Sequence, residues 1–259
     1  MSPRPSRPPV SPARIVVLGT GTSVGKTWFT RSLAEALRRE SADIVALKPI
    51  ETGVASSVSS APSDPRSTIR SVDPTTRSER FDWSLLAAVS TIRVLPPPFA
   101  FEDAVSPHLA ARRAGRTIEL PRVVEYVIAH ERAVTSHVTS FCLVESAGGC
   151  LSPLGIGVAN VDLAFALEPA TWILVAPDAL GVLHDVSATL GVLAARRRLP
   201  DHLVLSAARE PDASTGTNAA ELQALGIVTP SATIPRGDTR SLDALAKALV
   251  ARARSKPAS

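Results

Sequence analysis

Short apolar runs alternate with longer segments of helical periodicity along most of the chain. The apolar runs lie at residues 14–18, 43–47, 140–144, 171–177 and 202–206. Nearly continuous apolar runs of this length are typical of parallel strands that are buried on both faces. Helical patterns lie at residues 28–40, 81–88, 120–134, 181–197 and 217–225, and a further helix opens at residue 106. The alternation predicts an α/β fold: a doubly wound, mostly parallel sheet with helices on both faces.

The chain is predicted to form one domain over residues 14–253. Its 259 residues contain no sequence repeat and no second set of apolar segments that would build a separate core. Residues 1–13 are rich in Pro, Ser and Arg, so we expect a disordered tail rather than a secretory signal. Residues 54–80 have little periodicity and are expected to form a mobile insertion, preceded by a loop that begins at residue 50.

Charge and composition argue against several classes of partner. The formal net charge is +4 at pH 7, but the basic residues are scattered and aromatic residues make up only 4% of the chain, so we expect no nucleic-acid partner. No apolar run approaches the ~20 residues that span a bilayer, so we expect no membrane partner. Two cysteines, Cys142 and Cys150, indicate neither a disulfide framework nor a zinc site. This usage predicts a cytoplasmic protein.

Residues 19–27, Gly-Thr-Gly-Thr-Ser-Val-Gly-Lys-Thr, join the first predicted strand to the first predicted helix. A phosphate-binding loop needs this order, because glycines let backbone N–H groups point into one concavity and the helix adds its positive N-terminal end. Lys26 can reach the terminal phosphates, and the Thr27 hydroxyl can ligate Mg²⁺. Five residues separate Gly19 from Gly25, so the loop is one residue longer than the common pattern.

Reactive residues gather at the ends of the predicted strands. Lys48 follows the second strand and Glu145 follows the third. Only four lysines stand among the 28 Lys and Arg residues, so Lys26 and Lys48 indicate a need for a compact ammonium group at these strand ends. Ligands of open α/β sheets bind outside the carboxyl ends of the strands. We therefore expect one site assembled from residues 19–27, 48–52, 145–149 and the stretch after residue 176.

Together these motifs resemble the dethiobiotin synthetase family of biotin biosynthesis, and the resemblance runs from residue 15 to about residue 248. It is carried by the long phosphate loop, by Lys-Pro-Ile-Glu-Thr-Gly at 48–53, by Ser-Pro-His at 106–108 with Gly-Arg at 115–116, and by residues 144–149 with 152–154. The resemblance implies a P-loop NTPase-like fold and an ATP-dependent carbon–nitrogen ligase (a cyclo-ligase). The family is homodimeric, with substrate bound near the subunit interface.

The resemblance also implies a reaction. The substrates would be ATP, 7,8-diaminononanoate and CO₂, with Mg²⁺ as cofactor. One amine of the diamine takes up CO₂ as a carbamate, and ATP phosphorylates this carbamate to a carbamic–phosphoric anhydride. The second amine then closes the cyclic urea and expels phosphate.

Individual residues acquire roles from the same resemblance. Lys26 and Lys48 would lie beside the γ-phosphate and the carbamate and, with Thr22, would form the catalytic set. Mg²⁺ would be held by Thr27, Asp82 and Glu145, in keeping with its preference for oxygen ligands. The nucleotide would be bound by Thr22, Ser23, Val24, Gly25, Lys26, Thr27, Glu145, Ser146, Ala147 and Gly148. The diamine would be bound by Thr52, His184 and the backbone N–H groups of Gly148 and Gly149, which carry no side chain.

Three places depart from the family pattern. Ser146 stands where the family usually has glycine, beside the expected metal site. His184 replaces an asparagine near the position of the substrate carboxylate in the family. Residues 206–210, Ser-Ala-Ala-Arg-Glu, replace the Asn-x-Asp-like element that reads adenine. The sequence therefore leaves open whether the chain selects ATP over other nucleotides.

Two other functions stay open at this point. One is a nucleotide switch of the chromosome-partitioning type, which often adds a lysine where this chain has Gly21 and can end in a membrane-binding helix. Apolar positions 242, 245, 246, 249 and 250 form a helical stripe beside basic residues, but we expect this stripe to pack on the sheet. The other is a degenerate relative that binds nucleotide or a partner without turnover, which the three departures suggest.

Overall fold

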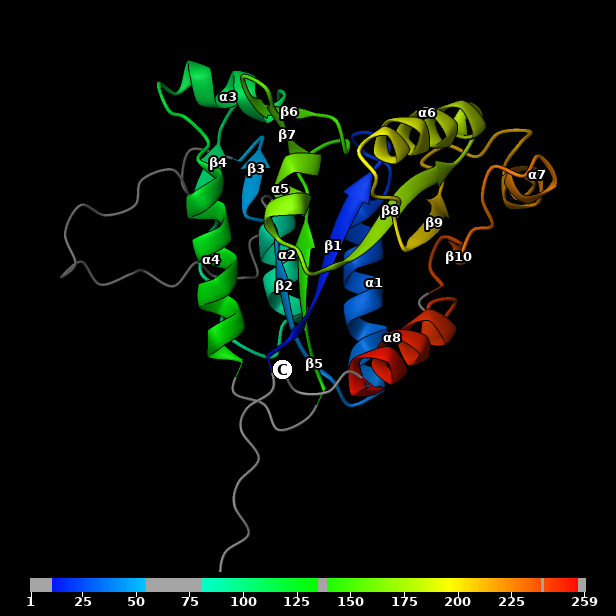
Figure 1. The fold of residues 1–259 in the computed structure, drawn as a ribbon, viewed down its shortest axis with the longest axis horizontal. Coiled ribbons are helices and arrows are strands. Elements are labelled where there is room, and N and C mark those ends of the chain that lie inside the picture. Colours follow the sequence, from blue (N-terminus) through cyan, green and yellow to red (C-terminus); the bar gives the residue numbers. More distant parts are fainter. Residues whose placement is uncertain (1–10, 55–80, 135–138, 239, 256–259) are drawn as a thin grey trace, which may run out of the picture.

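The computed structural model describes residues 11–54, 81–134, 139–238 and 240–255 (Figure 1). Six strands form one sheet in the order β10-β9-β8-β1-β5-β2, and every neighbouring pair is parallel. The strands are β1 (Ala13–Gly19), β2 (Asp43–Leu47), β5 (Ser140–Glu145), β8 (Thr171–Asp178), β9 (His202–Ala207) and β10 (Ala232–Ile234). From β1 the chain crosses to β2 at one edge, returns to β5, and then builds the strands on the other side of β1. The predicted doubly wound parallel sheet is confirmed.

Helices cover both faces of this sheet, because successive residues of a strand point to opposite sides. In β1, Val16 and Leu18 face one apolar cluster, whereas Ile15 and Val17 face the other. The first cluster is covered by α3 (Pro107–Arg113), α4 (Leu120–Ala133), α5 (Asn160–Ala166), α6 (Val182–Ala195) and α7 (Asn218–Ala224). The second is covered by α1 (Lys26–Arg39), α2 (Asp82–Val89) and α8 (Asp243–Ser255).

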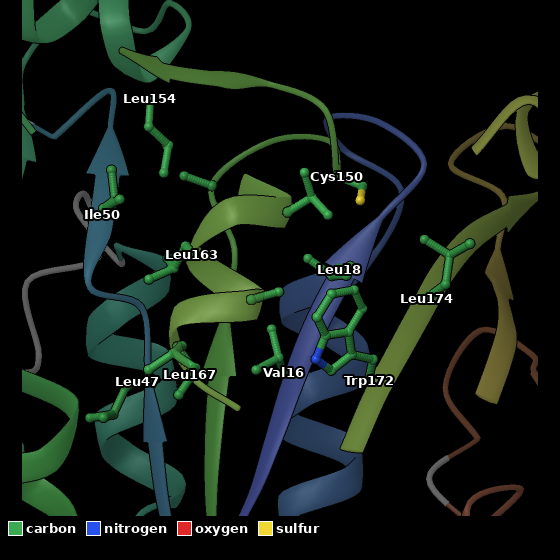
Figure 2. Close-up of a cluster of buried hydrophobic side chains, with 14 of the residues drawn as sticks. Val16, Leu18, Leu47, Ile50, Cys150, Leu154, Leu163, Leu167, Trp172 and Leu174 are labelled. Atoms are coloured by element: carbon green, nitrogen blue, oxygen red, sulfur yellow. The ribbon is translucent and has the colours of Figure 1, made fainter. Parts of the chain in front are cut away.

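Figure 2 shows the first cluster around Trp172 of β8. The indole lies beside Val16 and Leu18 of β1, in the layer between the sheet and α5. Phe165 of α5 meets the indole edge-on, with ring centroids 4.9 Å apart. Aromatic pairs in this orientation add attraction beyond the apolar area they bury. The contact fixes α5 against the centre of the sheet.

Two small strand pairs were not predicted from the sequence. A loop was expected from residue 50, but Ile50–Thr52 forms β3, which pairs in parallel with β4 (Phe99–Phe101). That expectation is wrong because Ile50 is buried with Phe99 from a distant segment, and such long-range pairing leaves no local pattern. The second pair is antiparallel and consists of β6 (Pro153–Gly155) and β7 (Val158–Ala159).

Two residues expected outside the ordered fold belong to it. Ala13, expected at the end of the tail, already belongs to β1 and pairs with Phe141. Val54, expected to open the insertion, is buried and its N–H donates to the Phe101 carbonyl oxygen at 3.0 Å. The chain therefore stays attached to the small sheet up to residue 54. The rest of the predicted tail up to residue 10, and residues 55–80 of the predicted insertion, lie outside the described residues.

The C-terminal apolar stripe packs on the sheet, as predicted. Its members are buried in the second apolar cluster: Leu242, Leu245, Ala246, Leu249 and Val250. This face of α8 is covered by the protein itself and is not available to a lipid surface. None of the helices in the described ranges combines the length and apolar content needed to cross a membrane.

A two-pronged ion pair ties the start of β1 to the helices of the first face. Arg14 Nε and Nη2 donate to the two carboxylate oxygens of Glu131 on α4, each at 2.6 Å, and Nη1 donates to the Leu167 carbonyl oxygen at 2.5 Å. The two side chains are only 15% and 13% exposed, so the pair is largely withdrawn from water. Removal of one partner would leave the other charge without compensation.

We expect Arg14→Met to lower the free energy of unfolding by about 2–3 kcal/mol, because Glu131 would lose its partner in a largely buried place. Urea denaturation measures this loss. Arg113→Met is the control, since Arg113 pairs with Asp103 at 3.1 Å on the exposed surface and its loss should cost less than about 1 kcal/mol. Equal losses in the two variants would show that the buried pair contributes no more than a surface pair.

Candidate functional site

The carboxyl ends of β1, β2 and β5 meet at one edge of the sheet beside a cavity of about 350 Å³. The winding of the chain reverses at β1, and α/β sheets bind ligands at such a point. The cavity is lined by Thr22, Ser23, Gly25, Lys26, Thr27, Trp28, Lys48, Thr52, Asp82, Glu145, Ala147 and Gly148. All of these except Trp28 are residues that the sequence predicts for the site. Three of the four expected stretches, 19–27, 48–52 and 145–149, therefore come together with Asp82, whereas no residue of the expected stretch after residue 176 lines the cavity.

The conformation of the phosphate loop depends on its close packing against β9. Gly25, the residue before α1, has a φ of 89°, and a Cβ there would overlap the Ser206 hydroxyl and lie 2.8 Å from the Ser206 Cβ. Glycine is therefore required both by the backbone conformation and by the approach of β9. The Val24 side chain is buried in the second apolar cluster and anchors the loop. Thr22 and Ser23 are exposed at the mouth of the cavity.

Lys26 begins α1 with its side chain folded back over the loop. Its Nζ donates to the Gly21 carbonyl oxygen at 2.9 Å, and the residue is only 6% exposed. Burial lowers the pKa of Lys26 to about 8, although the Glu145 carboxylate acts in the opposite direction. This buried ammonium is suited to receive anionic oxygen atoms, since an anion would replace the hydration that burial removes.

Glu145, at the end of β5, is the buried anion of the site. Its Oε1 accepts a hydrogen bond from Thr27 Oγ1 at 2.8 Å and lies 3.2 Å from Lys48 Nζ. Its Oε2 accepts a hydrogen bond from Thr30 Oγ1 at 3.0 Å. Thr30 was not predicted to belong to the site, although its place one helical turn after Lys26 was an available signal.

Lys48 pairs with the carboxylates of Asp82 and Glu145. Burial lowers the pKa of Lys48, but Glu145 and Asp82 outweigh burial and raise it above its ordinary value. Lys48 therefore stays protonated at physiological pH. Glu51 of β3 positions Asp82, one of the two partners of Lys48. The Glu51 carboxylate accepts hydrogen bonds from the backbone N–H groups of Asp82 and Trp83 at 2.7 and 3.0 Å. This cap at the start of α2 was also not predicted.

The turn after β5 packs against the phosphate loop. A Cβ on Gly149 would lie 3.2 Å from both Gly21 Cα and the Thr20 carbonyl oxygen, so the absence of a side chain lets the two turns touch. The Gly149 N–H donates to Ser152 Oγ at 2.9 Å and is engaged within the protein. Of the two glycines predicted to meet the substrate, Gly148 is the one that lines the cavity.

The three departures from the family pattern lie in different surroundings. Ser146 is buried, its N–H donates to the Val17 carbonyl oxygen at 3.0 Å, and its hydroxyl has no hydrogen-bond partner among the described residues. His184 is exposed on the first turn of α6 and does not line the cavity. Ser206 is buried against Gly25, and the two alanines that follow it have no polar side chain to offer a nucleotide base.

The oxygen donors of the cavity fit Mg²⁺. Thr27, Asp82 and Glu145 bring one hydroxyl and two carboxylates to the same cavity. Nucleotide sites usually hold this ion by one or two carboxylates, while phosphate oxygens and water complete the shell. Within the described part of the chain, no group of three or more His, Cys, Asp or Glu residues could hold a metal by itself. An ion at this place would therefore need phosphate oxygens as further ligands.

The two lysine ammonium groups of the cavity suit the stabilisation of negative charge on a bound ligand. Two buried ammonium groups, on Lys26 and Lys48, lie close enough that the charge of Lys48 contributes to lowering the pKa of Lys26. Groups placed in this way can neutralise the charge that develops on a transferring phosphoryl group. The cavity is therefore suited to phosphoryl transfer between a polyphosphate and a second anion.

Comparison with known proteins gives consistent matches. A family model described as an AAA domain matches residues 13–240. The ATP-dependent dethiobiotin synthetase BioD of Anaeromyxobacter dehalogenans strain 2CP-1 is 32% identical, and the match covers 85% of this chain and 89% of that protein. The protein of the same name from strain 2CP-C is 34% identical with the same coverage. That of Caulobacter sp. strain K31 is 30% identical over 92% of this chain and 94% of its own length.

Solved structures with similar topology have little sequence identity to this chain. The MinC:MinD cell division protein complex of Aquifex aeolicus is 12% identical, with 95% of this chain and 98% of that chain covered and a TM-score of 0.47. A ParA family ATPase from Chlorobium tepidum TLS is 16% identical, with 94% and 98% covered and a TM-score of 0.47. The fold assignment rests on the strand order and connections described above.

Lys26 should take up a proton when a polyphosphate binds. With a pKa of about 8, a large fraction of Lys26 is neutral at pH 8, and a bound anion raises that pKa. Binding should therefore be accompanied by proton uptake at pH 8 and should weaken as the pH rises above this value. Calorimetry of ATP binding in buffers of different ionisation enthalpy measures the protons taken up.

The matched variants for this measurement are Lys26→Met and Lys247→Met, the second on the exposed side of α8. The first should abolish proton uptake, and the second should leave it unchanged. A wild-type affinity that is the same at pH 7 and pH 9.5 would contradict the prediction.

Proposed function

The chain belongs to the dethiobiotin synthetase family, and on this premise we propose that it forms dethiobiotin from 7,8-diaminononanoate, CO₂ and ATP. The enzyme is an ATP-dependent carbon–nitrogen ligase. In the proposed reaction, one amine of the diamine takes up CO₂ as a carbamate and loses a proton, and a carbamate oxygen attacks the γ-phosphorus of ATP and expels ADP. The second amine then attacks the carbonyl carbon of the anhydride, phosphate leaves, and the cyclic urea closes.

The observation that carries this proposal is the position of Lys48. A general nucleotide site needs only the loop lysine and the loop hydroxyl for the phosphates and their metal. Here a second buried lysine lies in the same cavity, and its two carboxylate partners, Glu145 and Asp82, keep it protonated. A permanently cationic group beside a phosphate loop suits a second anion, and a carbamate is such an anion.

The nucleotide half of the site consists of the loop and the oxygen donors around Glu145. Lys26 binds the terminal phosphate oxygens, and Thr22 lies at the mouth of the cavity where the phosphates enter. Thr27, Asp82 and Glu145 would hold Mg²⁺, which supplies positive charge to the phosphate oxygens when it is bound. Lys48, in the same cavity, would contact oxygens of the carbamate and the γ-phosphate.

The diamine half of the site consists of residues after β2 and β5. Thr52 and Gly148 line the cavity and can hydrogen-bond the carbamate and its amine through a hydroxyl and a backbone N–H. Trp28 also lines the cavity. In this proposal, such contacts would orient the carbamate for attack on the γ-phosphorus.

A homodimer is part of the same proposal. His184 is exposed on α6, outside the cavity of its own chain. It can meet a substrate only if a second copy brings its α6 to that cavity. The resemblance to a homodimeric family supports this assembly.

The proposal predicts that phosphate release depends on both co-substrates. Purified protein with ATP and Mg²⁺ should release phosphate only when 7,8-diaminononanoate and bicarbonate are both present, because the acceptor of the phosphoryl group is the carbamate. Lys26→Ala should abolish this release, since the terminal phosphates lose their buried cation. Lys247→Ala, on the exposed side of α8, is the matched control and should retain wild-type activity. Release at an unchanged rate without the diamine would refute the ligase assignment.

A second prediction concerns Glu145. Glu145→Gln keeps the shape of the side chain but removes its charge, so the Mg²⁺ concentration for half-maximal phosphate release should rise about ten-fold or more. Glu221→Gln, on the exposed side of α7, is the matched control and should leave the Mg²⁺ requirement unchanged. A Mg²⁺ dependence that is the same in the wild type and in Glu145→Gln would remove Glu145 from the metal site.

A further inference from the structure

Asn160 is a buried polar residue that no motif of the sequence singles out. It is the first residue of α5 and is 0% exposed. Its Nδ2 donates to the Ala147 carbonyl oxygen at 2.6 Å and to the Gly149 carbonyl oxygen at 2.9 Å. One side chain thus holds the two carbonyl groups on either side of Gly148.

The backbone of α5 fixes the place of this side chain. The Asn160 N–H donates to the Ser152 carbonyl oxygen at 3.2 Å, and the Val161 N–H donates to the Cys150 carbonyl oxygen at 2.9 Å. The helix is also held on the sheet by the contact between Phe165 and Trp172. The amide of Asn160 therefore approaches the turn from a rigid element.

The direction of the Ala147 carbonyl group decides where the next N–H points. In a trans peptide unit the carbonyl oxygen and the amide hydrogen lie on opposite sides. Because Asn160 holds the Ala147 oxygen, the Gly148 N–H of the same unit points away from Asn160. Gly148 lines the cavity, and a Cβ on it would lie 3.5 Å from Thr22 Oγ1 of the phosphate loop.

The Gly148 N–H is a donor that the turn leaves available beside the cavity. The Gly149 N–H donates to Ser152 Oγ, and the Cys150 N–H donates to the Gly19 carbonyl oxygen at 2.6 Å. The Gly148 N–H donates to no acceptor in the described residues. A half-buried, preorganised N–H of this kind stabilises an anionic oxygen without a reorganisation cost.

The other end of the Asn160 amide supports a role beyond folding. Its Oδ1 is buried and has no hydrogen-bond partner among the described residues. A buried acceptor without a partner destabilises the folded chain. The useful part of the Asn160 side chain is therefore its Nδ2 group, which donates hydrogen bonds to the turn beside the cavity.

We propose that Asn160 is a positioning residue that aims the Gly148 N–H at an oxygen of the γ-phosphoryl group. The inference rests on the proposed function, because it takes the bound ligand to be a nucleoside triphosphate. In this arrangement the Gly148 N–H adds to the charges of Lys26 and Lys48 at the group that is transferred. ADP lacks that group and gains nothing from the contact.

The test compares triphosphate and diphosphate binding in Asn160→Leu. Leucine has the same number and branching of side-chain heavy atoms and removes the two donors together with the unpaired Oδ1, so the fold should be retained. Calorimetry should show affinity for β,γ-methylene-ATP reduced about ten-fold, as expected for loss of a hydrogen bond to a charged group, with the affinity for ADP changed less than about two-fold. Ser152→Ala, which frees the Gly149 N–H in the same turn, is the matched control and should leave the ratio of the two affinities unchanged. Equal losses for both nucleotides in Asn160→Leu, or no loss for either, would overturn the proposal.

A second measurement needs no variant. The chain has two Ala–Gly steps, at 114–115 and 147–148, so labelling with ¹³C-carbonyl alanine and ¹⁵N-glycine isolates the amide signals of Gly115 and Gly148. The Gly148 signal should shift with β,γ-methylene-ATP and much less with ADP, while the Gly115 signal outside the cavity should stay in place. A Gly148 signal that responds equally to both nucleotides would refute the contact. Protein that binds neither nucleotide would instead refute the proposed function, so the two failures can be told apart.

Discussion

The buried carboxylate of Glu145 is the constraint on which the site depends. A carboxylate that is 1% exposed is costly to bury unless cations and hydrogen-bond donors surround it. The hydroxyl groups of Thr27 and Thr30 on α1 and the ammonium group of Lys48 after β2 meet this need. One charge at the end of β5 therefore draws together two other strand ends, and the same donors that stabilise it form the cavity of the proposed ligase.

Close backbone contacts hold this cluster in place. β9 touches the phosphate loop through Ser206 and Gly25, and the turn after β5 touches the same loop through Gly149 and Gly21. In phosphoryl transfer the protein takes little part in covalent chemistry. Catalysis depends on positioning the reactants and on stabilising the charge of the transferred group. A loop packed on both sides by glycine contacts provides that positioning, and Asn160 would extend it to the Gly148 N–H.

Much of the fold and most of the cavity lining could be predicted from the sequence, because continuous apolar strands and a glycine-rich loop before a helix are local patterns. The pairing of β3 with β4 could not be predicted, since it depends on Ile50 meeting a segment about fifty residues away. The role of Glu51 was hidden for a related reason: a polar residue in a short strand does not reveal which partner it bonds, whereas Thr30 carried a local signal in its place one helical turn after Lys26. No sequence pattern marks residues that would bind the nucleotide base. The two alanines after Ser206 have no polar side chain for that role.

In the proposed reaction, this cavity transfers the γ-phosphoryl group of ATP to a carbamate oxygen. That oxygen leaves with the phosphate when the second amine attacks the carbonyl carbon, so its path can be followed. The measurement is mass spectrometry of phosphate and product from a single turnover with ¹⁸O-labelled bicarbonate, quenched before the label exchanges with water. The account predicts that the released phosphate carries an oxygen from bicarbonate and that the urea carbonyl of dethiobiotin carries another. Phosphate without an oxygen from bicarbonate would contradict it.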